Sequence, residues 1–278
     1  MKMSKILLGS LPALLALCIV SCSKSDDPTP DPGNPGGGQP GVISGAPLLD
    51  SVIETEDKGA INWLFKYNAD STLNAQLITN DAADIPNGYY FTYASGKLSR
   101  INYSETGNIN DTLSTDRQLI TYDAKGRPAL IYKVENVYNT KDSLVYNDNN
   151  QLIRTFSFEN GKLTYQDTLT WTGNNVTKIV SRENISGSTE TFLRTMTYRY
   201  DDKKNPFVSV RAAMFTEGEV NWLSENNVVE LVEKTSQENI EWKTTYSYVY
   251  NDKNYPVSGT WKGSSDLQTG SIRFVYKK

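Results

Sequence analysis

The chemistry open to this chain is limited by the absence of histidine and by a cysteine count of two in 278 residues. Without histidine, the chain cannot build Ser-His-Asp or Cys-His catalytic groups, histidine-bound haem or most zinc sites. Both cysteines, Cys18 and Cys22, lie near the N-terminus, so residues 47–278 have neither a thiol nucleophile nor a disulfide. We therefore predict no metal site, no bound cofactor and no enzymatic activity.

Paired carboxylates remain the one catalytic alternative, because two acids at the right separation suffice for glycoside hydrolysis. Nothing in the sequence selects such a pair. Aspartates that follow the expected strands favour a structural role, since aspartate in a turn hydrogen-bonds its own backbone. These residues are Asp123, Asp148, Asp201, Asp202 and Asp252.

Cys22 ends a short apolar segment and begins a polar, proline-rich one. Residues 1–5 carry two lysines, residues 6–20 are apolar, and Ser21 places a small side chain before the cysteine. About 20 apolar residues are needed to cross a bilayer, and Pro12 interrupts a run that is already shorter. Because Cys18 follows the bulky Leu17, Cys22 is the expected modification site.

This pattern resembles the lipobox of bacterial lipoproteins. The resemblance implies cleavage after residue 21, a diacylglycerol on the sulfur of Cys22 and an acyl chain, such as palmitate, on its new amino group. Such an anchor holds a protein on a membrane without any other element. The next residues resemble the export tag that places Bacteroidetes-type lipoproteins on the cell surface, although a solvated linker start is the alternative. They are Ser23, Lys24, Ser25, Asp26 and Asp27.

Residues 22–46 are expected to form a tether, because five prolines and six glycines leave nothing with which to build a core. As a flexible coil this segment spans roughly 27 Å. Removal of residues 1–21 takes away Lys2 and Lys5 and lowers the net charge from −4 to −6. A mildly acidic chain has no evident reason to seek nucleic acid or anionic lipid.

Residues 47–278 repeat one pattern, in which an aromatic residue precedes a polar turn and then an aliphatic residue or proline. The gap is six residues in Tyr67/Leu73, Tyr122/Pro128, Tyr146/Leu152, Tyr200/Pro206 and Tyr250/Pro256. It is five in Tyr93/Leu98, Phe158/Leu163, Trp171/Val176 and Leu223/Val228. One slot of the shorter turns holds Gly96, Gly161, Asn174 or Asn226, residue types that tolerate positive φ.

The runs between these turns are rich in Tyr, Thr, Val and Ile, which is typical of strands. An apolar spacing of three after the turns, as from Leu98 to Ile101, predicts a bulge early in each outgoing strand. We therefore expect one all-β domain over residues 47–278, a long antiparallel meander that forms a large twisted or curled sheet. Residues 207–222 depart from the pattern and are expected to form a helical or loop excursion.

The turns resemble YD repeats of the RHS type, and more closely an uncharacterised family of Bacteroidetes-type outer-membrane lipoproteins. The most specific segments are residues 198–207 (YRYDDKKNPF) and 223–228 (LSENNV). The resemblance implies a shell of β-hairpins and supplies no catalytic residue. The chain is far shorter than RHS proteins and lacks their toxin and protease parts, so their activity does not transfer.

Two further features are candidates for ligand binding and modification. Five tryptophans and 17 tyrosines suggest stacking on a glycan, and Trp261, between small residues, is the best candidate for an exposed ring. The triplet Asp-Ser/Thr-aliphatic resembles the O-glycosylation signal of exported Bacteroidetes-type proteins, although turn chemistry explains it as well. Its acceptors are Ser51, Thr112, Ser143 and Thr168.

These features predict a lipid-anchored outer-membrane protein, displayed at the cell surface, with a non-enzymatic binding or scaffolding role. Its partners are the membrane, through the lipid, and a glycan or protein ligand. The alternatives are a carboxylate-dependent glycan hydrolase and a purely structural component of the envelope.

Overall fold

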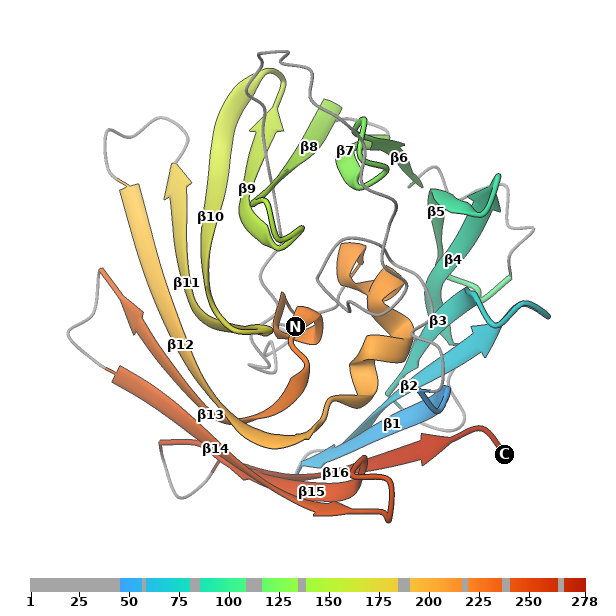
Figure 1. The fold of residues 1–278 in the computed structure, drawn as a ribbon, viewed down its shortest axis with the longest axis vertical. Helices are drawn as coiled ribbons and strands as arrows, with labels where there is room; N and C mark the ends of the chain where they lie inside the picture. The colour runs from blue at the N-terminus through green and yellow to red at the C-terminus, as the bar shows by residue number, and fades with distance from the viewer. Residues whose placement is uncertain are drawn as a thin grey trace, which may run out of the picture.

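The computed structural model describes residues 46–56, 59–80, 86–108, 117–134, 139–184, 191–216, 220–236, 241–264 and 268–278. These residues form an antiparallel β-barrel that surrounds two short 3-10 helices, η1 and η2 (Figure 1). The strands are β1 (Leu49–Glu56), β2 (Gly59–Tyr67), β3 (Leu73–Thr79), β4 (Asn87–Ala94), β5 (Lys97–Ser104), β6 (Arg117–Tyr122), β7 (Pro128–Val134), β8 (Asn139–Tyr146), β9 (Leu152–Glu159), β10 (Lys162–Thr172), β11 (Asn175–Asn184), β12 (Thr191–Lys204), β13 (Asn226–Thr235), β14 (Glu241–Tyr250), β15 (Pro256–Lys262) and β16 (Thr269–Tyr276).

The sheet closes on itself, and the expectation of an open twisted or curled sheet is wrong. Each strand pairs with its neighbours in the chain, and β1 also pairs with β16 from Leu49↔Tyr276 to Glu56↔Gly270. An open sheet would leave the backbone groups of both end strands unpaired, whereas closure joins them to each other. The hydrogen bond from the Lys277 amide to the Leu48 carbonyl, 2.9 Å long, extends this seam.

Most turns of the repeated pattern build one end of the barrel, here called the hairpin end. The Phe158/Leu163 turn instead joins β9 to β10 at the opposite end, and the predicted turns Tyr200/Pro206 and Leu223/Val228 are replaced by a direct Tyr200↔Val228 pair. An aromatic residue that ends one strand pairs with the aliphatic residue or proline that begins the next, and an extra residue follows in the outgoing strand. The predicted bulges are therefore confirmed. The pairs are Tyr67↔Leu73, Tyr93↔Leu98, Tyr122↔Pro128, Tyr146↔Leu152, Trp171↔Val176, Tyr200↔Val228 and Tyr250↔Pro256. The seam pair Tyr276↔Leu49 has the same form, so barrel closure repeats the hairpin geometry.

Side-chain hydrogen bonds link successive repeats at the hairpin end. In five of the repeats the aromatic side chain donates to the backbone carbonyl of the aliphatic residue or proline that begins the preceding strand. These bonds are Tyr67 to Leu49 (2.7 Å), Tyr122 to Leu98 (2.7 Å), Trp171 to Leu152 (2.7 Å), Tyr200 to Val176 (2.6 Å) and Tyr276 to Pro256 (2.6 Å). The aromatic position of the repeat is thus explained by packing together with one specific hydrogen bond.

The predicted positive φ is found at half of the four turn positions. Gly96 and Gly161 have φ of 75° and 81°, and the residue before each also has positive φ, as the tight primed turns require. Asn174 and Asn226 are not in the left-handed region. Gly173 carries the positive φ of the turn between β10 and β11 instead.

The helical excursion is confirmed, and it lies inside the barrel (Figure 1). It consists of η1 (Pro206–Phe215) and η2 (Val220–Leu223), which we call the plug. The Leu49 amide donates to the Ser209 hydroxyl (3.3 Å), and the Thr216 hydroxyl donates to Gln76 Oε1 (2.6 Å). These bonds tie the plug to β1 and β3.

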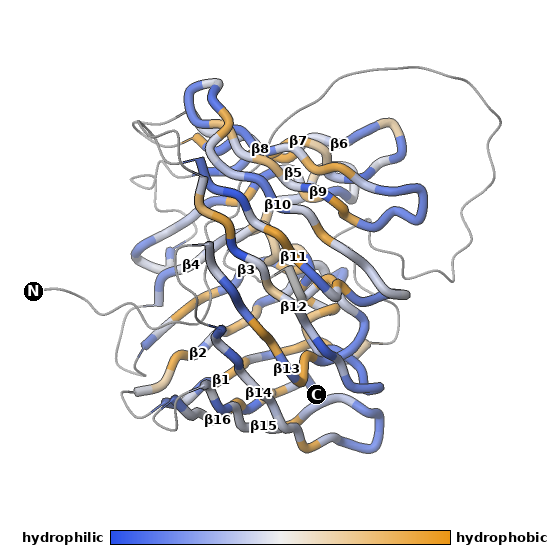
Figure 2. The backbone as a smooth tube through the Cα atoms, turned by 90° about the vertical axis from the view of Figure 1, so that its left-hand side faces the viewer, coloured by the Kyte–Doolittle hydropathy of each residue, from blue (hydrophilic) through white to orange (hydrophobic). Residues whose placement is uncertain are grey.

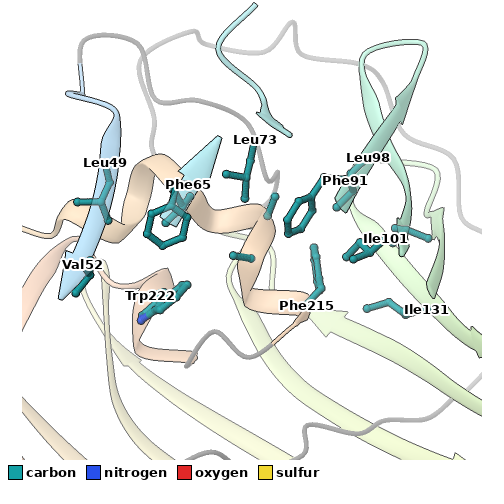
Figure 3. Close-up of a cluster of buried hydrophobic side chains, with 14 of the residues drawn as sticks. Leu49, Val52, Phe65, Leu73, Phe91, Leu98, Ile101, Ile131, Phe215 and Trp222 are labelled. Carbon is teal, nitrogen blue, oxygen red and sulfur yellow. The ribbon is translucent and has the colours of Figure 1, made fainter. Parts of the chain in front are cut away.

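The plug completes the larger of two apolar clusters. Figure 3 shows Phe215 and Trp222 of the plug directed at side chains from β1 to β7. Trp222 also stacks on Phe207, with ring centroids 4.2 Å apart and ring planes 4° from parallel. The buried members of this cluster are Leu49, Val52, Phe65, Leu73, Phe91, Leu98, Ile101, Ile120, Ile131, Val210, Ala212, Ala213, Phe215, Trp222 and Phe274.

Candidate functional site

The two faces of the barrel wall differ in chemistry, because alternate residues of a strand point to opposite sides. On β14 the inward positions hold Trp242, Thr244, Tyr246, Tyr248 and Tyr250, all partly buried, while Glu241, Lys243, Ser247 and Val249 on the outward side are exposed. Figure 2 shows hydrophilic and hydrophobic residues interspersed along the strands. A membrane-spanning barrel has the reverse arrangement, with an apolar outer band and a polar interior.

Polar side chains nevertheless gather on part of the inner wall, beyond the apolar clusters. Strand alternation places them on the same side as buried apolar residues such as Ile131, Leu169 and Ile179. We call this set the polar belt. It runs across β7 to β13 and consists of Lys133, Thr140, Asp142, Thr155, Ser157, Asp167, Ser181, Arg194 and Glu233.

The strand register brings the members of the polar belt side by side. Thr140 pairs with Lys133, Ser157 with Asp142, Asp167 with both Thr155 and Ser181, and Ser181 with Arg194. Within the belt, Lys133 forms an ion pair of 3.1 Å with Asp142, and Arg194 forms one with Glu233. Residues that are scattered along a hundred positions of sequence thus form one continuous polar surface.

Asp167 is the most deeply engaged carboxyl group of the polar belt, with 5% of its surface exposed. It accepts hydrogen bonds from the hydroxyls of Ser181 (2.5 Å) and Thr155 (3.0 Å). Burial raises the pKa of Asp167 above its ordinary value, and the two hydroxyl donors and the Arg194 charge oppose that rise. Each belt acid is therefore held by hydroxyl groups or a base, an arrangement suited to fixed hydrogen bonding.

Several buried polar atoms on the inner wall have no hydrogen-bond partner among the described residues. They are Gln76 Nε2, Gln118 Oε1, Thr140 Oγ1, Ser157 Oγ, Arg194 Nε and Trp261 Nε1. Buried polar atoms are normally hydrogen-bonded to protein or to another molecule. Because these atoms are fully buried and come from separate strands, they lie within the packed wall and do not by themselves form a binding surface.

The structure places Trp261 on the inner wall, half-buried rather than exposed. It pairs with Tyr246 on one side and with Gly270 on the other. A Cβ atom at position 270 would lie 2.5 Å from the indole nitrogen, so the glycine makes room for the ring. Its role in stacking on a ligand stays a prediction.

The remaining predicted site residues are distributed as follows. Cys22, the export tag from Ser23 to Asp27, and Thr112 lie outside the described residues. Ser51 and Ser143 are buried within β1 and β8, and Thr168 is partly buried on β10. The folded barrel gives a modifying enzyme little access to the two serines, and their glycosylation stays a prediction.

The triplets that suggested glycosylation have a second meaning in the structure. In Asp142-Ser143-Leu144 and Asp167-Thr168-Leu169 the acid and the leucine point inward. The triplet therefore marks where a strand crosses from the polar belt to the apolar core. Asp142 and Asp167 are not among the aspartates predicted to lie in turns, although their alternation with a core leucine is visible in the sequence. Of the predicted set, Asp201 and Asp202 lie within β12 rather than in a turn.

Among the described residues, no group of three or more acidic or cysteine side chains is placed to hold a metal ion. No helix in the described part of the chain is long and apolar enough to span a membrane.

Comparisons with known proteins show similarity of fold. No protein-family model and no curated protein matches the sequence. A porin-like protein from Bacteroides uniformis is 14% identical, with a TM-score of 0.53 over 82% of this chain and 96% of that one. A porin-like protein from Bacteroides vulgatus is 8% identical, with a TM-score of 0.47 over 83% of this chain and 99% of that one. The resemblance to YD repeats gains no support here, and the chain shares its barrel fold with a porin-like protein.

Proposed function

We propose that this chain is a lipid-anchored, non-enzymatic binding protein of the outer membrane whose barrel stands in water beside the bilayer. The observation that carries this proposal is the polarity of the wall. Exposed charges such as Glu241 and Lys243 face outward on β14, and the aromatic residues of the same strand face inward. An Arg or Lys on the lipid face of a barrel costs about 2–4 kcal/mol at the bilayer midplane. The wall also exposes cations in the middle of strands, such as Lys178 of β11 and Arg199 of β12, so it is suited to water.

A barrel that does not cross the membrane needs another means of attachment, and Cys22 with its proposed lipid supplies one. The linker ends near Leu49, at the hairpin end of the barrel, where the C-terminal Tyr276 also lies. The plug and the apolar clusters fill that end, so the described residues favour a closed base over a continuous pore.

The polar belt supplies the proposed binding role. Its partly exposed members, such as Lys133 and Glu233 with 20% of each side chain exposed, offer hydrogen bonds to a polar ligand such as a glycan. The hydrolase alternative is less well supported, because Asp142 and Glu233 are neutralised by Lys133 and Arg194, and Asp167 is held by two hydroxyls.

The test is to insert a site-specific protease sequence after Gly38 of the full chain and to cleave isolated cell envelopes. We expect the barrel to appear in the supernatant without detergent and to keep its native circular dichroism spectrum. The Cys22→Ser variant should fail to incorporate a labelled fatty acid. A barrel that stays with the membranes after complete cleavage, and dissolves only in detergent, would show that it is integrated in the bilayer.

A further inference from the structure

The outer wall carries one region in which exposed apolar side chains and unpaired cations occur together. Leu119 and Tyr132 pair across β6 and β7, and each is 38% exposed. Leu163 of β10 is 36% exposed and pairs with Phe158 of β9. We call this region, with Phe156 and the outward cations of β5 to β9, the basic-aromatic face.

The cations of this face are Arg100, Arg117, Lys141 and Arg154. Arg100 pairs with Leu119, and Lys141 lies between Tyr132 and Phe158 in the register of the sheet. The Lys141 ammonium lies 5.9 Å from the centre of the Phe158 ring. Cations are therefore interleaved with the apolar side chains rather than set apart from them.

Acids are absent from the outward positions of this region in the part of the chain that the structure describes. The acids of β5 to β9, Asp142 and Glu159, occupy inward positions of the wall. None of the four cations has an ion-pair partner among the described residues. On the other side of the barrel, outward acids lie among the cations, and some of these cations are paired, as Lys243 is with Glu230 and Lys234 with Glu241.

We propose that the basic-aromatic face docks the barrel sideways onto the anionic, phosphate-bearing headgroups of the membrane to which the chain is tethered. Unpaired cations among tyrosine and phenylalanine side chains match the chemistry of a membrane interface, where each Lys or Arg near an anionic surface contributes about 1 kcal/mol. The inference rests on the proposed lipid anchor, because a linker of roughly 27 Å keeps the barrel within reach of the headgroups.

A fluorescence experiment on the full lipidated chain tests this orientation. The Tyr132→Cys variant, labelled with a thiol-reactive fluorophore, is reconstituted in vesicles that contain a headgroup-attached quencher. Thr260→Cys is the matched control, because Thr260 is exposed on β15, which lies across the barrel from β7 (Figure 1). We expect strong quenching at position 132 in vesicles with phosphatidylglycerol, weaker quenching in phosphatidylcholine alone, and little at position 260.

Charge variants show whether the cations of the face bring the label to the headgroups, or whether the linker alone does so by keeping the barrel near the membrane. Adding Lys141→Gln and Arg154→Gln to the labelled chain should shift the docking equilibrium in anionic vesicles by about tenfold or more. Lys262→Gln with Arg273→Gln, two exposed cations on β15 and β16, should leave it unchanged. Equal quenching at positions 132 and 260 would overturn the proposal.

A protein partner would give a different result. If the label at position 132 is not quenched in anionic vesicles but is protected on intact cells, the face binds a protein and the lipid proposal is wrong. Either failure leaves the proposed anchor untouched, since release of the barrel by cleavage in the linker tests the anchor independently.

Discussion

Burial and hydrogen bonding act in opposite directions on the carboxyl group of Asp167. Desolvation raises its pKa, and the hydroxyls of Ser181 and Thr155 partly offset that rise by stabilising the anion. A folded-state pKa above the unfolded value means that the folded protein binds more protons, so this group lowers stability as pH rises through that interval.

The Asp167→Asn variant should reveal this contribution. Relative to the wild type, its free energy of unfolding should rise as pH increases from about 4 to about 8, because the variant cannot ionise. Urea unfolding at a series of pH values measures the difference. The exposed Asp70 is the control of opposite sign, since hydrogen bonds from Thr72 lower its pKa below the ordinary value of 3.8. Relative to the wild type, the unfolding free energy of Asp70→Asn should fall as pH rises through the range below about 4 and stay constant above it. A constant difference between wild type and Asp167→Asn would refute this account.

The hydroxyl of Tyr122 is a second residue whose role can be isolated. It donates to the Leu98 carbonyl at 2.7 Å, and burial raises its pKa to about 12, so the donor stays protonated at neutral pH. Tyr122→Phe keeps the ring, including its contact with the Lys97 ammonium at 5.0 Å, and removes only the donor. We expect a loss of about 1 kcal/mol in unfolding free energy.

Tyr132→Phe is the matched control for this substitution, because Tyr132 lies on the outer wall and is partly exposed. Its unfolding free energy should change little. Equal losses in the two variants would mean that the hydrogen bond from Tyr122 to Leu98 contributes nothing measurable to the unfolding free energy.

At the scale of elements, the plug fills the hairpin end of the barrel as part of the apolar core. Trp222 has 8% of its surface exposed and lies flat against Phe207. Trp222→Ala should cost about 3–5 kcal/mol in unfolding free energy, as removal of a buried aromatic side chain usually does. Urea unfolding followed by circular dichroism measures the loss.

Trp222→Phe serves as the conservative comparison, since a phenyl ring can still stack on Phe207. It should recover a large part of the stability lost in the alanine variant. If Trp222→Ala unfolds at the same urea concentration as the wild type, the plug is not part of the cooperative unit and could leave the barrel on its own.

The hairpins could be predicted because their information is local. A polar turn of fixed length, a proline that starts a strand and an apolar spacing of three each depend on a few adjacent residues. The positive φ expected at Asn174 was wrong because Gly173, one residue earlier, accepts that conformation more easily. The plug was foreseen only as a departure from the repeat, since its position depends on contacts with Gln76 and Leu49, far away in sequence.

At the scale of the whole molecule, the β1–β16 seam and the basic-aromatic face could not be predicted from the sequence, because both arise only when the sheet closes into a barrel. The seam joins Leu49 to Tyr276, the two halves of one repeat placed at opposite ends of the domain. The basic-aromatic face gathers Arg100, Lys141 and Arg154 from separate strands, and the net charge of −4 conceals it. The net charge of the whole chain predicts no affinity for anionic lipid. The fold, however, turns these cations outward and the acids of β5 to β9 inward.

If the seam is equivalent to the other hairpin pairs, the position of the chain ends is not essential to the fold. A circular permutant tests this equivalence. It joins Lys278 to Ala46 through a short glycine-serine linker and opens the chain between Asp148 and Asn149, in the exposed turn that connects β8 and β9. The ends to be joined already meet, because the Lys277 amide donates to the Leu48 carbonyl.

We expect the permutant to keep the circular dichroism spectrum of residues 46–278 and to differ in unfolding free energy by about 1 kcal/mol, which corresponds to roughly 2–4 °C in Tm. A second permutant, opened between the buried Ala212 and Ala213 of the plug, should fail to fold. Failure of the first permutant would mean that the covalent connection from β8 to β9 is needed to start the barrel. The seam would then be the last pairing to form, and the repeats would not be interchangeable.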